Sequence, residues 1–325
     1  MTMIKLLIIA ILLLLIELLY FRIADRFNII DKPNQRSSHK SITLRGGGII
    51  FLFSIWIYAA FFGLQYVWFV VGATLIAAIS FVDDVVSVPN RFRLVVHFAA
   101  MLLMFYQLGF LAWGQWYIVL IALIVCTYII NAYNFMDGIN GITGGYSLAV
   151  LVPLAVANSK VAAVDQNLIY VLMMSVLVFC FFNFRKKAKC FAGDVGAVTI
   201  AFAIVFLVFS FIEKTQNVLW IMLLVVYGVD SVLTIIHRFL LKENIFEAHR
   251  KHAYQLMANE LKKPHVAVSC FYMVIQMAVS FGLLYLPINK WLYSITVILV
   301  LCVAYVMFKK KYYHLHEEYL RAQNK

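Results

Sequence analysis

Five aspartates stand at the ends of long apolar runs, or just beyond them, in a chain that otherwise keeps charge out of those runs. An ionised carboxylate this close to hydrocarbon costs several kcal/mol unless it is paired, hydrated or bound to a metal. We therefore expect these side chains to converge on one site that holds a divalent cation and a phosphorylated substrate. The five residues are Asp83, Asp84, Asp137, Asp194 and Asp230.

Asp83 and Asp84 are adjacent and close one of the apolar runs. Neighbouring carboxylates repel each other unless a cation lies between them. Such a pair could bind Mg²⁺, take a proton from an attacking group, or do both. A polar helix end at the membrane interface explains an isolated pair equally well. Arg91 and Arg93, in the same loop, could hold a phosphate, balance the acids or anchor the topology.

A second polar group has a spacing of three residues, with Asn131, Asn134, Asp137 and Asn140 in succession. Residues three apart share one helical face, so these four side chains would point the same way if the helical turn continues. Such a row at the end of a membrane helix favours binding over core packing. We expect it to line a substrate pocket.

Asp194 follows Gly193 where another apolar run begins. The positive end of a helix dipole beside a carboxylate suits a metal–diphosphate complex, because Mg²⁺ takes few protein carboxylates and adds phosphate oxygens. Upstream, the basic segment Lys32–Gly48 contains Lys32, Arg45 and three consecutive glycines, whose backbone N–H groups could approach a phosphate. Taken alone, this segment fits better as a basic loop that packs tightly through its glycines.

The last large polar segment carries His249, Arg250 and His252. The two histidines would share one face if the segment is helical. Two histidines and an arginine are suited to gripping a diphosphate. A zinc site would need further ligands, and Cys190 is the only thiol expected nearby, so zinc is not favoured.

The composition indicates which class of protein contains these polar groups. Hydrophobic residues make up 64% of the 325 residues, charged residues only 13%, and the mean hydropathy is +0.91. Soluble domains have about 25% charged and about 45–50% apolar residues. The chain is therefore predicted to be an all-α, polytopic integral membrane protein with a single domain over residues 1–325. The first apolar run is predicted to be an uncleaved helix, because no small-residue cleavage site follows it.

Apolar runs long enough to cross about 30 Å of hydrocarbon recur along the whole chain, so about 10–11 transmembrane helices are predicted. The eleven expected spans are 3–22, 47–63, 66–82, 94–110, 116–133, 143–157, 167–184, 196–212, 217–236, 265–285 and 291–308.

The connections between these spans differ in charge. One set contains most of the 27 Lys and Arg residues, whereas the other side has only Lys5, Lys160, Lys214 and Lys290. The positive-inside rule places the first set in the cytoplasm, the N-terminus outside and the C-terminus inside. All five aspartates then fall on the cytoplasmic side, so the active site is expected at that face.

Taken together, the motifs identify a resemblance. The chain resembles the polyprenyl-phosphate N-acetylhexosamine-1-phosphate transferases, the integral-membrane family that includes phospho-MurNAc-pentapeptide translocase. The resemblance extends from about Asp31 to Tyr254 and rests on five motifs in family order. The motifs are Lys32–Gly48, Asp83-Asp84, Asn131–Gly141, Gly193–Gly196 and His249–His252.

The resemblance implies a Mg²⁺-dependent reaction, with Mn²⁺ as an alternative ion, at the inner face of the cytoplasmic membrane. Undecaprenyl phosphate would attack the β-phosphate of a UDP-N-acetylhexosamine, releasing UMP. Asp83, Asp84 and Asp194 would be the catalytic residues, and metal ligands would come from these three and Asn134. The implied substrate-binding residues are Lys32, Arg45, Asn131, Asn134, Asp137, Asn140, His249, Arg250 and His252. Membrane lipids are the other expected partners, nucleic acid is not expected, and a homodimer stays open.

Three departures from the family pattern bear on the donor. Asn140 stands where the family often has a second aspartate, and Ser87 stands where the peptidoglycan branch has a lysine. The histidine motif also differs from the His-x-His-His of that branch. These differences favour the branch that initiates O-antigen, capsule or teichoic-acid glycans, whose donor is commonly UDP-GlcNAc or a modified relative.

Two other classes of membrane protein also place carboxylates in or beside membrane helices. A transporter or proton-coupled carrier also keeps acids in membrane helices, but it predicts carboxylates near the bilayer midplane and paired repeats. A phosphotransferase acting on CDP-alcohols would need a different array of aspartates. The position of the acids at helix ends favours the sugar-phosphate transferase over both.

Overall fold

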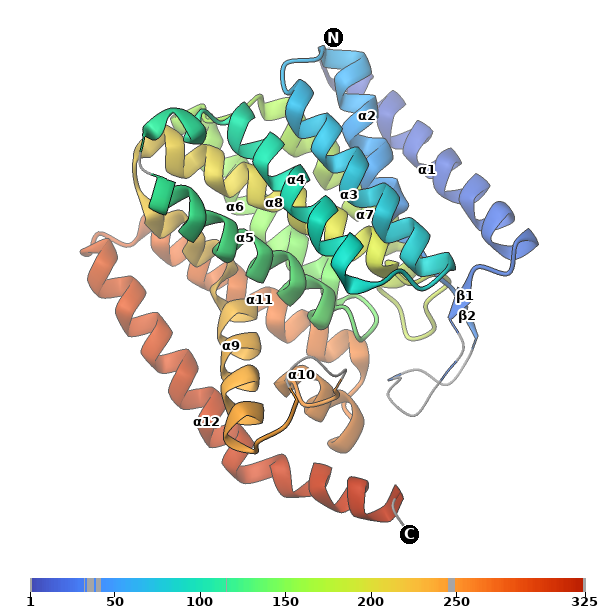
Figure 1. The fold of residues 1–325 in the computed structure, drawn as a ribbon, viewed down its shortest axis with the longest axis vertical. Coiled ribbons are helices and arrows are strands. Elements are labelled where there is room, and N and C mark those ends of the chain that lie inside the picture. The colour runs from blue at the N-terminus through green and yellow to red at the C-terminus, as the bar shows by residue number, and fades with distance from the viewer. Residues whose placement is uncertain are drawn as a thin grey trace.

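The computed structural model describes residues 2–31, 33, 38, 42–114, 116–244 and 249–323, and helices that pack side by side form most of it (Figure 1). Lys32, one of the predicted substrate-binding residues, lies outside the described residues. The α-helices are α1 (Thr2–Arg26), α2 (Ile50–Phe62), α3 (Val67–Val85), α4 (Asn90–Gln107), α5 (Trp116–Met136), α6 (Ile142–Val161), α7 (Gln166–Asn183), α8 (Gly193–Thr215), α9 (Val225–Leu240), α10 (Ala253–Gln255), α11 (His265–Tyr285) and α12 (Lys290–Gln323).

Shorter elements connect these helices. Three 3₁₀ segments, a π-helical segment and a two-stranded antiparallel sheet complete the described structure. The 3₁₀ segments are Gly47–Ile49, Phe110–Trp113 and Val218–Leu224, the π-helical segment is Leu256–Glu260, and the strands are β1 (Ile30–Asp31) and β2 (Thr43–Leu44).

The predicted all-α, polytopic fold is confirmed. Within the described ranges, nine helical stretches are long and apolar enough to cross a membrane, and Gly47–Phe62 is a shorter apolar helix. Each of the eleven predicted spans overlaps one of the helices α1–α9, α11 and α12. The largest difference is α12, which continues to Gln323, well beyond the predicted end at residue 308.

Helix α8 forms the centre of the bundle, and almost all of it is buried. It packs against α3, α5 and α6, and the ring of Phe69 on α3 stacks on Phe206 with centroids 4.1 Å apart. A helix that is apolar on every face is stable when protein or lipid surrounds it, and here neighbouring helices do so. The start of α8, which carries Asp194, is therefore held by the helices around it.

The three consecutive glycines tie the first loop to α8 through backbone contacts. Gly47 and Gly48 donate their N–H groups to the carbonyls of Phe191 and Ala192, at 2.9 and 3.1 Å. A Cβ atom on Gly48 would lie 2.3 Å from the Cα of Gly196, so only glycine allows this approach. The packing interpretation of these glycines is the one that the contacts support.

The small sheet brings Arg45 to the same place. Asp31 on β1 pairs with Thr43 on β2, and Leu44 forms an isolated bridge with Cys190 just before α8. Arg45 follows β2 directly, so its side chain starts next to the N-terminus of α8. The strand pairing thus places a cation from the first loop beside Asp194.

Candidate active site

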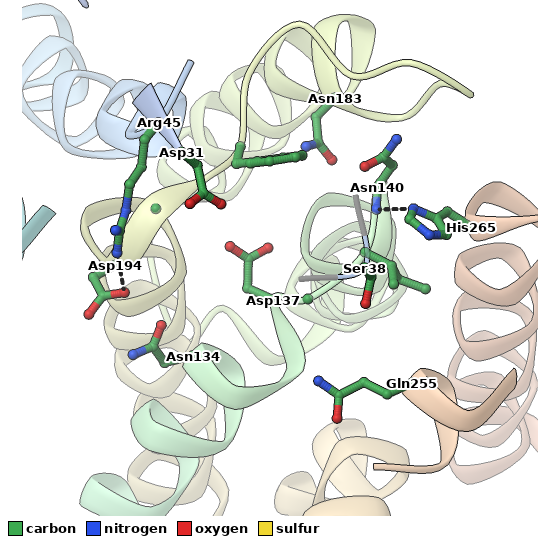
Figure 2. Close-up of a pocket in the computed structure, with 14 residues that line it drawn as sticks. Asp31, Ser38, Arg45, Asn134, Asp137, Asn140, Asn183, Asp194, Gln255 and His265 are labelled. Atoms are coloured by element: carbon green, nitrogen blue, oxygen red, sulfur yellow. Dashed lines mark hydrogen bonds and ion pairs between the residues drawn. The ribbon is translucent and has the colours of Figure 1, made fainter. Parts of the chain in front are cut away.

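A polar pocket lies where the ends of α5, α7 and α8 meet the first loop and the start of α11 (Figure 2). Its cavity volume is about 310 Å³. The side chains around it come from positions between residues 31 and 265, so tertiary packing alone brings them together. Its polar lining consists of Asp31, Ser38, Arg45, Asn134, Asp137, Asn140, Asn183, Asp194, Gln255 and His265.

Two arginines join three of the predicted aspartates into one network beside this pocket. The Arg45 side chain lies 2.6 Å from Oδ1 of Asp84 and 3.4 Å from Oδ1 of Asp194. Arg93 lies 2.7 Å from Oδ2 of Asp83 and 2.9 Å from Oδ2 of Asp194. The structure therefore brings Asp83, Asp84 and Asp194 together, as expected, and shows the cations that balance them.

Within this network, Asp84 caps helix α8. Its two carboxylate oxygens accept the backbone N–H groups of Asp194 and Val195, each at 2.9 Å, and the side chain is completely buried. The first N–H groups of a helix have no partner inside the helix, and a carboxylate there also interacts favourably with the helix dipole. Asp84 thus holds the helical turn that carries Asp194. The Asp83 side chain is 12% exposed, so it is the more accessible of the pair.

Asp137 points into the pocket, opposite Arg45 and Asp194 (Figure 2). Thr143 donates a hydrogen bond of 2.6 Å to its Oδ1 atom. Burial raises the pKa of Asp137 to about 7, and the carboxylates of Asp194 and Asp84 add to this effect, whereas Thr143 and Arg45 oppose it. A partly neutral carboxyl that faces other acids is a position where a bound cation would favour the ionised form.

Helix α5 ends at Met136, so the row of four polar residues is only partly helical. Asn134 and Asp137 both line the pocket, as predicted. Asn131 is not among the described lining residues, and its amide donates to the carbonyl of Thr127 one turn earlier. Its assignment to substrate binding stays a prediction without a contact in support.

Asn140 and Asn183 shape the wall of the pocket between α6 and α7. The Asn140 amide donates to the carbonyl of Arg185 at 2.9 Å, and Asn183 accepts the N–H of Gly141 at 2.7 Å. Asn183 also donates to the carbonyl of Cys190 at 2.8 Å. These bonds fix the loop that leads into α8, so the asparagines support the site whether or not they touch substrate.

The histidine segment does not form the expected helical face, because α10 begins only at Ala253 and His252 is its N-cap. Among the described residues, the pocket lining includes none of His249, Arg250 and His252. Burial, with the nearby His252, Arg238 and Lys251, lowers the pKa of His249 to about 3, so this imidazole is neutral at physiological pH. The diphosphate-gripping role of this segment stays a prediction.

Asp230 lies with this segment and is held away from the arginine network. Its carboxylate accepts the Tyr272 hydroxyl at 2.6 Å and the Ala253 N–H at 3.1 Å, and it lies 3.3 Å from Nδ1 of His252. The expectation that all five aspartates meet is therefore wrong for this one. This buried carboxylate, in the first half of α9, anchors the start of α10 instead.

Several lining residues were not predicted from the sequence. Gln255 lies three residues after His252, Asn183 ends α7, and His265 begins α11 after Pro264. Asn183 and His265 are polar residues at the border of an apolar run, which is the one signal that could have found them, whereas Gln255 lies within a polar segment and carries no such signal. Asp31 was noted only as the start of the matching region, and Ser38 as part of the basic loop.

The donor chemistry of the pocket fits a hard divalent cation. Carboxylate and amide oxygens from Asp137, Asp194, Asn134 and Asp31 border it, and Mg²⁺ prefers oxygen ligands. Among the residues that the structure describes, no three His, Cys, Asp or Glu side chains are grouped as a complete metal site. This is compatible with Mg²⁺, which usually takes one or two carboxylates and completes its shell with phosphate oxygens and water.

Comparison with known proteins agrees with the motifs. Residues 66–212 match the family model of glycosyl transferase family 4. The chain is 25% identical over 263 residues to a "probable undecaprenyl-phosphate N-acetylglucosaminyl 1-phosphate transferase" of Bacillus subtilis, covering 73% of this chain and 72% of the relative. It is also 25% identical over 278 residues to the undecaprenyl-phosphate alpha-N-acetylglucosaminyl 1-phosphate transferase of Escherichia coli K12, covering 73% and 71%.

A third relative represents the other branch. The phospho-N-acetylmuramoyl-pentapeptide-transferase of Thermotoga neapolitana is 33% identical over 153 residues, which cover 46% of this chain and 49% of the relative. The residues that match the family model, 66–212, include the C-terminal ends of α3 and α5 and the start of α8, where the aspartates of the site lie. Residues 66–212 are therefore similar to glycosyl transferase family 4, in agreement with the resemblance that the motifs predicted.

Proposed function

We propose that this protein transfers N-acetylglucosamine-1-phosphate, or the 1-phosphate of a closely related N-acetylhexosamine together with its sugar, from a UDP-sugar to undecaprenyl phosphate and releases UMP. The names of the relatives from Bacillus subtilis and Escherichia coli support this reaction. The observation that carries the proposal is that Asp137, Asp194 and Arg45 line one polar pocket at the helix ends, with Arg93 paired to Asp194.

In this reaction an oxygen of the lipid phosphate forms a bond to the β-phosphorus of the donor. The bond from that phosphorus to the bridging oxygen breaks, and UMP leaves with the electron pair. Negative charge surrounds the reacting phosphorus throughout. Arg45 and Arg93 already balance carboxylates beside the pocket, so their guanidinium groups are fixed positive charges that would also stabilise the phosphates.

Mg²⁺, or Mn²⁺ in its place, would be held by Asp194 with Asn134 and Asp137, and would neutralise phosphate oxygens. Asp194 is pre-positioned for this by the cap from Asp84 and by Arg93 at 2.9 Å. Of the adjacent pair, we assign the handling of the lipid phosphate or its proton to Asp83, because Asp84 is fully buried and occupied by two N–H groups.

The site would face the cytoplasm, in the cytoplasmic membrane of a bacterium. The basic connections lie at the end of the bundle where the pocket opens, and the positive-inside rule places such an end inside the cell. A water-soluble donor could enter from that side while the acceptor stays in the bilayer. The carrier hypothesis receives less support, because the pocket carboxylates follow α5 or begin α8 and are not near the middle of a span.

A transfer assay tests the proposal. Purified protein would be mixed with undecaprenyl phosphate, Mg²⁺ and a panel of labelled UDP-N-acetylhexosamines, and label would be followed into the organic phase with and without EDTA. EDTA-sensitive labelling from one donor, with equimolar UMP, is the expected result and would name the sugar. If folded protein labels no lipid from any donor, and UMP does not reverse the reaction on native lipids, the proposed function is wrong.

A further inference from the structure

The C-terminal end of α12 contacts residues 250–260, which include α10 (Figure 1). We define the C-terminal brace as Lys309–Tyr319 of α12. Lys309 donates a hydrogen bond to the carbonyl of Lys251, and Nδ1 of His316 lies 2.9 Å from Oε1 of Glu260. The guanidinium of Arg250 lies over the ring of Tyr319, 4.3 Å from its centroid.

Glu260 links the two sides of this contact. Its Oε1 atom accepts from Arg250 at 2.9 Å as well as facing His316, and both Glu260 and His316 are almost fully buried. An arginine held by a buried carboxylate and an aromatic ring is not free to leave for a phosphate without breaking both contacts. The Arg250 side chain is thus committed to the brace.

The geometry of α12 explains why its end makes these contacts. Its 34 residues would extend about 51 Å at 1.5 Å per residue, whereas about 20 residues cross the hydrocarbon. Only 11% of its most apolar window is buried inside the protein, so most of that part faces lipid. Tyr313, His316 and Tyr319 are three residues apart and share one face. The brace therefore attaches the polar end of this helix, in addition to the packing of α12 against α9 and α11.

The charged side chains of Arg250 and Lys251 contact α12, whereas the side chain of Gln255 lines the pocket. Gln255 lines the cavity with its amide directed towards it (Figure 2). Its Oε1 atom accepts the N–H of His252 at 3.2 Å, and its amide also bonds to the Tyr254 hydroxyl, which leaves one of its two N–H groups for an acceptor in the pocket. The neighbouring Tyr254 hydroxyl donates to the carbonyl of Phe135 at 2.9 Å, next to Asn134.

We propose that Gln255 donates a hydrogen bond to the sugar-nucleotide donor and that the C-terminal brace positions it, with Glu260 and His316 as positioning residues. This inference rests on the proposed function. It identifies Gln255, just after the histidine segment, as the residue that contacts the donor. Gln255 would contact an oxygen of the sugar or of the diphosphate. The brace would act only through the placement of α10 and would not touch substrate.

The test uses full-length protein and measures apparent KM values for the UDP-sugar and for undecaprenyl phosphate separately. Loss of one donated hydrogen bond gives a change of roughly tenfold. Gln255→Ala and His316→Ala should each raise the KM for the donor by about that factor and leave the KM for the lipid within about twofold. His316→Gln, which keeps an N–H donor for Glu260, should restore the donor KM. His314→Ala, an exposed position on the same helix, is the matched control and should behave as wild type.

The double variant separates positioning from an independent effect. If His316 acts through Gln255, the variant lacking both side chains should be no worse than Gln255→Ala alone. Additive losses, an unchanged donor KM in either single variant, or an effect confined to the lipid would overturn the proposal.

Failure of the proposed function is recognised separately, because wild type would then transfer no sugar phosphate to lipid. Equilibrium binding of labelled UDP-GlcNAc would still decide the role of the brace. Weaker binding by Gln255→Ala and His316→Ala than by wild type would support it. Equal binding, or no binding by folded wild type, would reject it.

Discussion

Replacing Asp84 by Asn tests whether this residue caps α8 or takes part in the chemistry. The change keeps the shape of the side chain and removes its charge. One amide oxygen can still accept an N–H from Asp194 or Val195, but the NH₂ group would face the other N–H at the place where the carboxylate now accepts at 2.9 Å. The ion pair with Arg45, at 2.6 Å, is also lost.

The expected loss of stability follows from these contacts. A helix cap contributes about 1–2 kcal/mol, and breaking a buried ion pair costs about 3–5 kcal/mol. Arg45 is 33% exposed, which reduces the second contribution, so we expect a total loss of roughly 2–4 kcal/mol. Thermal unfolding should then occur roughly 5–10 °C lower. Because Asp194 occupies the same helical turn, turnover should fall on the order of 100-fold.

Thermal unfolding in detergent and the lipid-labelling assay measure the two effects side by side. Asp25→Asn, the same change at an exposed position near the end of α1, is the control and should alter neither. Wild-type stability together with wild-type turnover in Asp84→Asn would refute the capping argument. Wild-type stability with turnover lost would assign Asp84 to the chemistry instead.

The remaining predictions concern the metal, the histidine segment and the glycine contact. Asp194→Asn should abolish turnover while leaving a monodisperse size-exclusion profile, and wild-type activity in that variant would remove Asp194 from the metal site. EDTA should stop lipid labelling and excess Mg²⁺ should restore it; labelling that persists in EDTA would contradict a metal requirement. His252→Ala should raise the KM for the UDP-sugar more than that for the lipid and lower the unfolding temperature, because Asp230 loses a partner in a buried site; a change only in the lipid KM would contradict this. Gly48→Ala should reduce the yield of folded protein, since the new Cβ would lie 2.3 Å from the Cα of Gly196, and a variant with the wild-type melting curve would show that the backbone can shift.

Predictions from the sequence succeeded where one local stretch of chain carries enough information. The eleven spans were predicted because hydrocarbon thickness requires about 20 apolar residues in a row. Boundaries were less certain: α12 extends to Gln323 because its polar end finds partners in Glu260 and Arg250, which the apolar pattern cannot indicate.

The same limit applies to the site. Asp137 and Asn134 were predicted to line it because polar residues at the end of a membrane helix require a reason to be there. Gln255 was missed because one polar residue in a polar segment carries no such signal. His249 and Arg250 were predicted to bind substrate because of their chemistry, but neither is among the described lining residues of the pocket. Arg250 instead contacts Glu260 and also Tyr319 of α12.

The sequence by itself determined that the chain is an all-α membrane protein, similar over residues 66–212 to glycosyl transferase family 4, whose acidic motifs lie at helix ends. That information is local, since the cost of placing charge in hydrocarbon acts on each segment separately. Only the tertiary structure decided which carboxylate does what: Asp84 caps α8, Asp194 meets two arginines, and Asp230 holds the start of α10. The physical reason is that a carboxylate's role depends on which donors lie within about 3 Å of it, and those donors come from segments far apart in the chain.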